Sequence, residues 1–229
     1  MSWQQNLNFA PFEFKSLVNG KDTLVGADIE LAKAIGEKLG VKVEFSVMSF
    51  DNVLANVQSG KADIAIAGIS VTDERKKVYD FSDSYYTSEN VVIVKKDKVN
   101  DYTSTDSLAK QTVGTQKGSV QETVAKKQIP KASVVSLSSN GEMINELKSG
   151  QLQAVVLEKA IAEGYIAQND DLTLANFNLK SDGTDAYAVA TRKGSDDLLK
   201  EINAVIKETK DSGKFDQWLK EASTYKQSK

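Results

Sequence analysis

The sequence predicts an α/β protein in two lobes, each built on a central, mostly parallel sheet. Three observations point to this class. Short runs rich in valine and isoleucine alternate with amphipathic stretches of helical length. Glycines and helix-capping residue types stand where these stretches begin and end, and one helix-to-strand pattern occurs twice. Strands that alternate with helices in this way are typical of parallel sheets covered by helices.

Seven short apolar runs define the expected strands. They cover residues 41–47, 62–67, 90–96, 111–115, 132–137, 152–157 and 186–192. Most of them are rich in β-branched residues, which favour the extended conformation.

Amphipathic stretches between these runs define the expected helices. In the stretch 27–39, Ile29, Ala32 and Ile35 share one face. Glu30 falls on another face, as the period of a helix requires. Similar stretches cover residues 119–128, 140–149, 158–168 and 196–210.

Start and stop signals agree with these helices. Gly40 follows the first helix as a C-terminal glycine would. Asp51 stands at the expected N-cap of a helix that ends at Gly60, and Ser138 or Ser139 can cap the helix over 140–149.

Two segments that lie 90 residues apart, 50–68 and 140–158, share the order helix, Ser-Gly, polar residue and apolar strand. The repeat indicates either two similar lobes or two ordinary helix-to-strand connections. Both interpretations remain open at this point.

No linker rich in proline, glycine or serine separates the lobes, so short extended segments must join them. The candidates are 90–97 and 184–193. Two such joins predict a discontinuous lobe one, 1–90 plus 188–229, and a continuous lobe two, 91–187. This two-segment hinge permits closure of one lobe on the other.

Composition excludes several classes of function. The 229 residues include no cysteine and no histidine, which removes thiol nucleophiles, catalytic triads with histidine, and histidine-rich metal sites. We predict no cofactor, no metal site and no catalytic residue. The net charge of −3 is spread along the chain, which argues against nucleic acid as a partner.

No apolar run is long enough to span a membrane, and the opening MSWQQNLNF lacks the features of a signal peptide.

Arginine is scarce in this chain. Of the 29 basic residues only Arg75 and Arg192 are arginine. A planar guanidinium can grip a carboxylate with two parallel hydrogen bonds, which lysine cannot do. Arg75 directly follows an expected buried strand, where Thr72 or Asp73 can cap a short helix, so it is either an anion-binding group at the sheet edge or a surface residue of a charged turn.

Long motifs carry a family resemblance. Residues 9–94 contain APFEFK, VGADIELAKAIGEKLGVKVEF and SFDNVLANVQSGKADIAIAGISVTDERKKVYDFSDSYY. These resemble the polar amino acid substrate-binding proteins of ABC importers, most closely the glutamine/arginine-binding branch, and a looser similarity continues through the rest of the chain. The resemblance implies the type II periplasmic binding protein fold, with the ligand in a cleft between the lobes.

The same resemblance implies ligand-binding residues in lobe one. Arg75 would bind the α-carboxylate of the ligand. The strand-end residues Ala67, Gly68 and Ser70 would offer backbone groups and a hydroxyl to the same zwitterion.

In lobe two, the resemblance implies that the helix N-terminus at Ser119, Val120 and Gln121 favours the ligand carboxylate through its amides. Glu158 takes the place of the acid that binds the ligand ammonium, with helix capping as the alternative. Gln116 matches a position that lines the pocket, or has a role only in its loop.

Two aromatic residues, Phe9 and Phe50, match the family positions that flank the ligand side chain; packing in the core is the alternative. Asn6 stands where some relatives that bind basic amino acids have an acid. The polar opening also departs from the apolar first strand of the family, so this strand is expected to be short, replaced or irregular.

The resemblance therefore predicts a monomeric extracytoplasmic protein that captures glutamine or arginine by lobe closure and delivers it to a membrane ABC permease. Two alternatives stay open. The chain could be the ligand-sensing domain of a receptor, or a dehydratase for a small acid with Glu158 as its acid or base.

Overall fold

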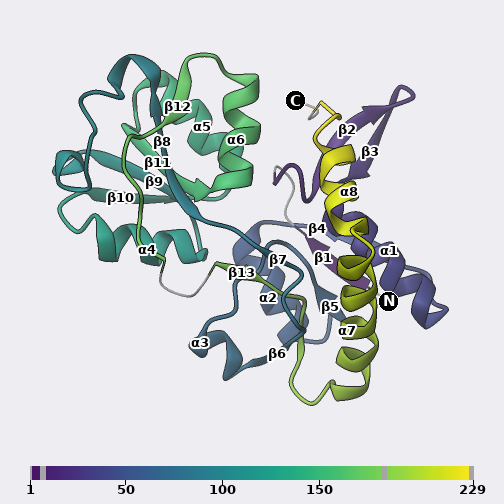
Figure 1. Cartoon of the computed structure of the whole chain (residues 1–229). Helices are drawn as coiled ribbons and strands as arrows, with labels where there is room; N and C mark the ends of the chain where they lie inside the picture. The colour runs from purple at the N-terminus through teal and green to yellow at the C-terminus, as the bar shows by residue number, and fades with distance from the viewer. Residues whose placement is uncertain (1, 6–8, 182–184, 227–229) are drawn as a thin grey trace. The chain divides into compact units, whose positions relative to one another are not determined.

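The α/β fold class is confirmed by the computed structural model, which describes residues 2–5, 9–181 and 185–226 (Figure 1). Two five-stranded sheets, each accompanied by helices, make up most of the structure.

The chain divides into two compact units. Unit 1 comprises Met1–Thr87 and Ala186–Lys229, and unit 2 comprises Ser88–Asp185. The chain therefore passes between the units twice. Most residues of the two expected joins, 90–97 and 184–193, lie in strands of the units themselves.

The main sheet of unit 1 has the strand order β4-β1-β5-β14-β6. Its members are β4 (Glu44–Val47), β1 (Ser2–Gln5), β5 (Ile64–Ala65), β14 (Ala190–Arg192) and β6 (Tyr79–Phe81). The polar opening of the chain thus forms a regular strand, and β1 pairs in parallel with both β4 and β5.

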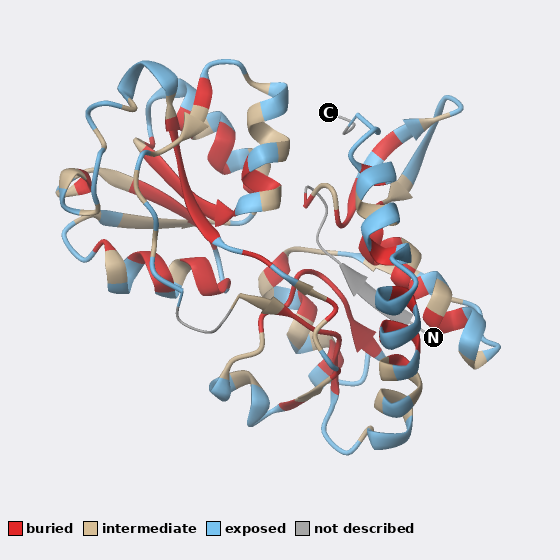
Figure 2. Cartoon of the chain, in the orientation of Figure 1, coloured by how far each residue is buried: buried red, intermediate tan, exposed pale blue. Residues whose placement is uncertain are grey.

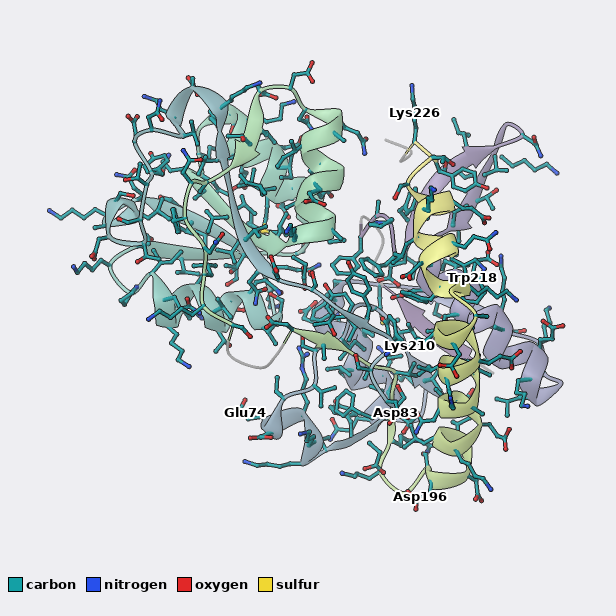
Figure 3. The ribbon with its side chains drawn as sticks, viewed as in Figure 1. Glu74, Asp83, Asp196, Lys210, Trp218 and Lys226 are labelled. Carbon is teal, nitrogen blue, oxygen red and sulfur yellow. The ribbon has the colours of Figure 1, made fainter. Side chains whose placement is uncertain are left out.

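Five helices and two strand pairs complete the described part of unit 1. The helices are α1 (Ala27–Leu39), α2 (Phe50–Gln58), α3 (Asp73–Lys76), α7 (Asp196–Asp211) and α8 (Lys214–Ala222), and the strand pairs are β2 (Phe14–Val18) with β3 (Lys21–Val25) and β7 (Tyr86–Thr87) with β13 (Ala186–Tyr187). Polar contacts fix α7 against the segment that precedes β7. Lys210 donates to the Ser84 carbonyl at 3.0 Å, and the Asp83 N–H donates to Asn203 Oδ1 at 2.8 Å (Figure 3).

Unit 2 is continuous in sequence, and its sheet has the order β10-β9-β11-β8-β12. Its elements are β8 (Asn90–Lys95), β9 (Thr112–Gln116), α4 (Val120–Gln128), β10 (Ser133–Leu137), α5 (Asn140–Ser149), β11 (Ala154–Glu158), α6 (Lys159–Gln168) and β12 (Leu172–Leu174), with single 3-10 turns at Lys96–Lys98 and Asp106–Leu108. The strands β8 and β11 are almost wholly buried, as continuous apolar strands in the middle of a sheet should be (Figure 2).

Both main sheets are mixed, whereas mostly parallel sheets were expected from the sequence. In unit 1, β14 runs antiparallel to β5 and β6. In unit 2, β8 runs antiparallel to β11 and β12. Both β8 and β14 follow closely on a chain crossing between units, so neither strand is fed by the strand-helix-strand connection that enforces parallel pairing.

Helix caps follow the sequence closely, with one correction. Ser139 accepts the Glu142 N–H and caps α5, as expected of one of the two serines. The expected cap of α2 is wrong, because this helix begins at Phe50 and has Ser49, not Asp51, at its N-cap. Asp51 lies in the first turn instead, where an acid is also favourable.

Candidate functional site

Arg75 of unit 1 is held on three sides. Thr72 caps α3 by accepting the Arg75 N–H at 3.1 Å, which fixes the backbone of this short helix. The side chain donates from Nη1 to the Ser70 carbonyl at 2.8 Å. Its guanidinium carbon also lies 5.8 Å from the centre of the Phe50 ring, within the range of a cation–π contact. The capped turn, the strand end and the ring together orient the guanidinium fork.

The strand end 67–70 follows β5 and is buried. Ala67 and Ser70 are almost completely covered, and Ser70 forms an isolated bridge to Tyr187. Gly68 has a φ of +56°, and a Cβ there would lie 2.4 Å from Cε1 of Phe9. Only glycine fits both the left-handed backbone and the close approach of the ring.

Phe9 and Phe50 both lie in the hydrophobic interior of unit 1. Phe9 is 4% exposed and packs with Phe12 and Tyr187 in an aromatic cluster, with ring centres 5.5 and 6.3 Å away. Phe50 belongs to the core beside β5. Both rings thus pack in the core, as the alternative interpretation expected, and both also touch residues of the predicted site.

A buried acid lies behind Gly68. Asp28, in the first turn of α1, is fully buried, and its Oδ2 accepts the Gly68 N–H at 3.3 Å and the Tyr85 hydroxyl at 3.1 Å. Burial raises the pKa of the Asp28 carboxyl to about 7 from 3.8, although the hydrogen bonds from Tyr85 and Gly68 oppose the rise. Within the described residues, Oδ1 has no hydrogen-bond partner.

The corresponding group in unit 2 centres on Glu158, which is 6% exposed at the end of β11. Gln121 donates from Nε2 to Oε1 of Glu158 at 2.8 Å and to Oδ1 of Asn90 at 2.7 Å. Asn90 in turn donates from Nδ2 to Oδ1 of Asp185 at 3.3 Å. Glu158 occupies the N-cap position of α6, yet its side chain makes no capping hydrogen bond.

The turn between β9 and α4 is also well ordered by local bonds. Ser119 donates its hydroxyl and its N–H to the Gln116 carbonyl, at 2.7 and 3.2 Å, and stands at the N-cap of α4. Val120 and Gln121 form the first turn, which presents backbone amides suited to an anion. Gln116 is 5% exposed, and among the described residues its Nε2 has no partner.

Comparison with known proteins gives these groups a context. Residues 4–222 match the bacterial extracellular solute-binding proteins, family 3. The chain belongs to this family.

Individual relatives and a solved structure support this family assignment. The arginine-binding extracellular protein ArtP of Bacillus subtilis is 34% identical over 93% of this chain and 82% of its own length. The glutamine-binding protein GlnH of an ABC transporter, from the same organism, is 33% identical over 86% of this chain and 73% of its own length. The structure of the amino acid ABC transporter substrate-binding protein AbpA from Streptococcus pneumoniae, bound to L-arginine, is 50% identical with a TM-score of 0.94, and the match covers 97% of this chain and 94% of AbpA.

These relatives of the solute-binding family are binding proteins and not enzymes, and the family is extracellular. Among the residues that the structure describes, no helix combines the length and hydropathy needed to cross a membrane.

Within each unit, the structure brings several predicted residues of the solute-binding site together. In unit 1, Arg75 contacts Ser70 and Phe50, and Gly68 contacts Phe9. In unit 2, two separate groups form: Glu158 with Gln121, and Ser119 with Gln116. Two further predicted residues, Val120 and Ala67, are chain neighbours of Ser119 and Gly68. Asn6 lies outside the described residues.

Sequence reasoning missed three polar residues, Asp28, Asn90 and Asp185. A signal for Asp28 was present: it stands at positions i, i+4 and i+7 with Ala32 and Ile35, on the apolar face of its helix, where a charged residue is unexpected. Asn90 and Asp185 carry no comparable signal, because they come from segments 95 residues apart that meet only in the fold.

Proposed function

We propose that this chain captures a free polar amino acid outside the cytoplasm, arginine first and glutamine second, and delivers it to the permease of an ABC importer. Membership of the solute-binding family and the arginine-binding and glutamine-binding relatives support this function. The observation that carries it in the structure is the fixed guanidinium of Arg75 at a buried strand end.

In this proposal, Arg75 binds the ligand carboxylate. The Ser70 carbonyl fixes one edge of the guanidinium, and the Phe50 ring covers its face, so the fork keeps its direction without a ligand. A donor set that is already oriented loses little entropy on binding.

Glu158 binds the ligand ammonium. The side-chain amide of Gln121 donates one hydrogen bond to Glu158 and one to Asn90. These bonds hold the Glu158 carboxylate at the end of β11. A buried acid needs a cation to offset its loss of hydration, and the ammonium of an amino acid provides one. The start of α4, from Ser119 to Gln121, would add amide donors to the ligand carboxylate.

Both units would thus contact the same zwitterion. Only the closed state would make both sets of contacts, so the ligand would shift the equilibrium toward closure by its differential affinity. In this proposal the chain acts as a monomer and releases its ligand unchanged to the permease. The lobes expected at 1–90 plus 188–229 and at 91–187 would correspond to unit 1 and unit 2, with boundaries shifted by two or three residues. Asn6, Gln116 and Phe9 would be close to the ligand side chain.

Isothermal titration calorimetry with the twenty amino acids tests the function. We expect arginine to bind, with glutamine as the second candidate. The variant Arg75→Lys should lose at least about tenfold in affinity, since lysine keeps the charge but loses one of two parallel hydrogen bonds, and a hydrogen bond to a charged group is worth about 1.5–3 kcal/mol. Glu158→Gln should lose at least about tenfold, because the amide carries no charge to offer the ammonium.

Matched substitutions control for general damage. Arg192→Lys changes the other arginine, which is exposed, and Glu163→Gln changes an exposed acid of α6. Both should bind as the unaltered chain does. Binding of no amino acid, or full affinity in Arg75→Lys, would contradict the proposed function.

A further inference from the structure

Asp28 is buried at the back of the strand end to which the proposed function assigns ligand contacts. Its helix is pressed closely against the preceding loop: Gly26 has a φ of +134°, and a Cβ there would lie 2.0 Å from the Phe12 carbonyl oxygen. The Asp28 N–H donates to that same carbonyl at 2.9 Å. The backbone around Asp28 is therefore fixed, and its carboxyl can reach Gly68 from the interior.

Phe9 packs against Gly68, and its ring leaves no room for a Cβ. Gly68 is thus in contact with both an aromatic ring and a carboxyl. The N–H that Asp28 accepts belongs to the peptide that also contains the Ala67 carbonyl. An anion at the N–H end polarises the whole peptide and makes its carbonyl a stronger acceptor.

From this geometry we propose that Asp28 is a positioning residue of the amino acid site, which holds the Ala67–Gly68 peptide in place and strengthens it as an acceptor for the ligand ammonium. The proposal rests on the proposed function, because it takes the strand end 67–70 as part of the ligand site.

Whether the Asp28 carboxyl is protonated or ionised should then affect the affinity for the ligand. An ionised carboxylate makes charge-assisted hydrogen bonds, which are roughly twice as strong as neutral ones. Because the pKa of Asp28 lies at about 7, the carboxyl gains its charge as the pH rises through neutrality. Affinity should therefore rise as the pH rises through this value.

The groups that face Asp28 do not offset its charge. Burial raises the pKa of Tyr85 well above its usual value of 10, and the negative charges of Asp28 and Glu13 raise it further, so Tyr85 stays protonated and donates. The electrostatic influence of Tyr187 raises the pKa of Tyr85 as well. Within the described residues, no lysine or arginine forms an ion pair with Asp28.

The test measures arginine affinity by calorimetry between about pH 5.5 and about pH 8.5, on either side of the Asp28 pKa. The unaltered chain should gain about fivefold in affinity across this range, the difference expected between a neutral and a charge-assisted hydrogen bond. Asp28→Asn should remove most of this rise and keep the weaker affinity throughout, because its amide oxygen still accepts but carries no charge.

Two further variants sharpen the result. Glu30→Gln neutralises an exposed acid in the first turn of the same helix and should keep the full pH response. Tyr85→Phe removes a hydrogen bond that lowers the pKa of Asp28, so the midpoint of the response should move to higher pH. The Phe ring preserves the packing of Tyr85 on Phe215.

An NMR titration without ligand separates this proposal from the proposed function. The Gly68 amide resonance should shift with the Asp28 midpoint in the unaltered chain and stay constant in Asp28→Asn. A constant Gly68 resonance, or an unchanged pH response of affinity in Asp28→Asn, would overturn the positioning role while arginine binding itself stands. Failure to bind any amino acid at every pH would instead overturn the proposed function and this role with it.

Discussion

At the scale of single residues, the burial of the Asp28 carboxyl is unfavourable. A carboxyl that is removed from water without a cation costs stability, and the raised pKa of Asp28 is the direct sign of this cost. Arg75 shows the opposite case, because its guanidinium has a carbonyl and an aromatic face as partners. Residues that weaken the fold locally but orient a binding segment are expected at functional sites.

The cost of Asp28 predicts a pH dependence of stability. Its pKa is raised in the folded state from 3.8 to about 7, so the folded chain binds this proton more tightly than the unfolded chain does. The contribution to stability is therefore fully present below about pH 4 and is lost as the pH rises through about 7. Over this interval the free energy of unfolding should fall by up to roughly 1.4 kcal/mol per pH unit from this group alone.

Urea denaturation of the unaltered chain and of Asp28→Asn between about pH 4 and about pH 8 measures the effect. The difference between the two free energies of unfolding isolates Asp28 from the other carboxyls. We expect Asp28→Asn to gain relative stability as the pH rises. A difference that does not vary with pH would show that Asp28 titrates normally, and Glu30→Gln serves as the reference for an exposed acid.

At the scale of elements, the chain uses helix starts in two ways. The α5 helix begins with a side-chain cap, because Ser139 accepts the Glu142 N–H while Ser138 donates to the Glu142 carboxylate. The α4 helix begins without one, because Ser119 turns its hydroxyl back to the Gln116 carbonyl. A start whose amides are not used by the cap residue is the arrangement that an anion site requires.

The cap of α5 gives a stability prediction. Ser139→Ala should lower the free energy of unfolding by about 1 kcal/mol, because an amide of the first turn loses its acceptor. Ser138→Ala removes only an exposed hydrogen bond and should cost less than about 0.5 kcal/mol. Equal losses in the two variants, measured by chemical denaturation, would contradict the assignment of the cap to Ser139.

The elements were also the features that the sequence predicted best. The apolar runs and caps predicted most strands and helices, because their period and their end signals are local. The predicted N-cap of α2 was wrong by two residues, since both Ser49 and Asp51 are good caps and local sequence does not decide between them. The strands β8 and β14 were expected from their apolar runs, but their antiparallel direction was not, because pairing direction depends on where the chain enters each unit. Asn90 and Asp185 were missed for the same reason, because their contact is created by the fold.

At the scale of the whole molecule, the polar network of unit 2 ends at both chain crossings. Asn90 follows the first crossing and Asp185 precedes the second, and the Ser88 N–H donates to the Asp185 carbonyl at 2.8 Å. In unit 1, Thr87 and Ala186 pair in β7 and β13. The two crossing segments are therefore paired within each unit, and the Glu158 carboxylate is joined to them through Gln121 and Asn90.

The proposed function predicts how a ligand acts on the two units. If a single amino acid is bound by Arg75 of unit 1 and by Glu158 of unit 2, saturation with arginine should slow hydrogen exchange at the strand end 67–70 and at the first turn of α4 together. Ligand that binds only the folded, closed form suppresses local opening in both places in proportion to its occupancy.

Hydrogen exchange followed by mass spectrometry can read both segments in one experiment. In Glu158→Gln, a ligand concentration that saturates the unaltered chain should protect neither segment fully, because the lost ammonium contact lowers occupancy of the whole site. Glu163→Gln, with its exposed acid on α6, should show full protection in both. Protection confined to unit 1, or protection of 67–70 that survives intact in Glu158→Gln, would mean that Glu158 does not contact the ligand, because a shared ligand couples the two segments by necessity.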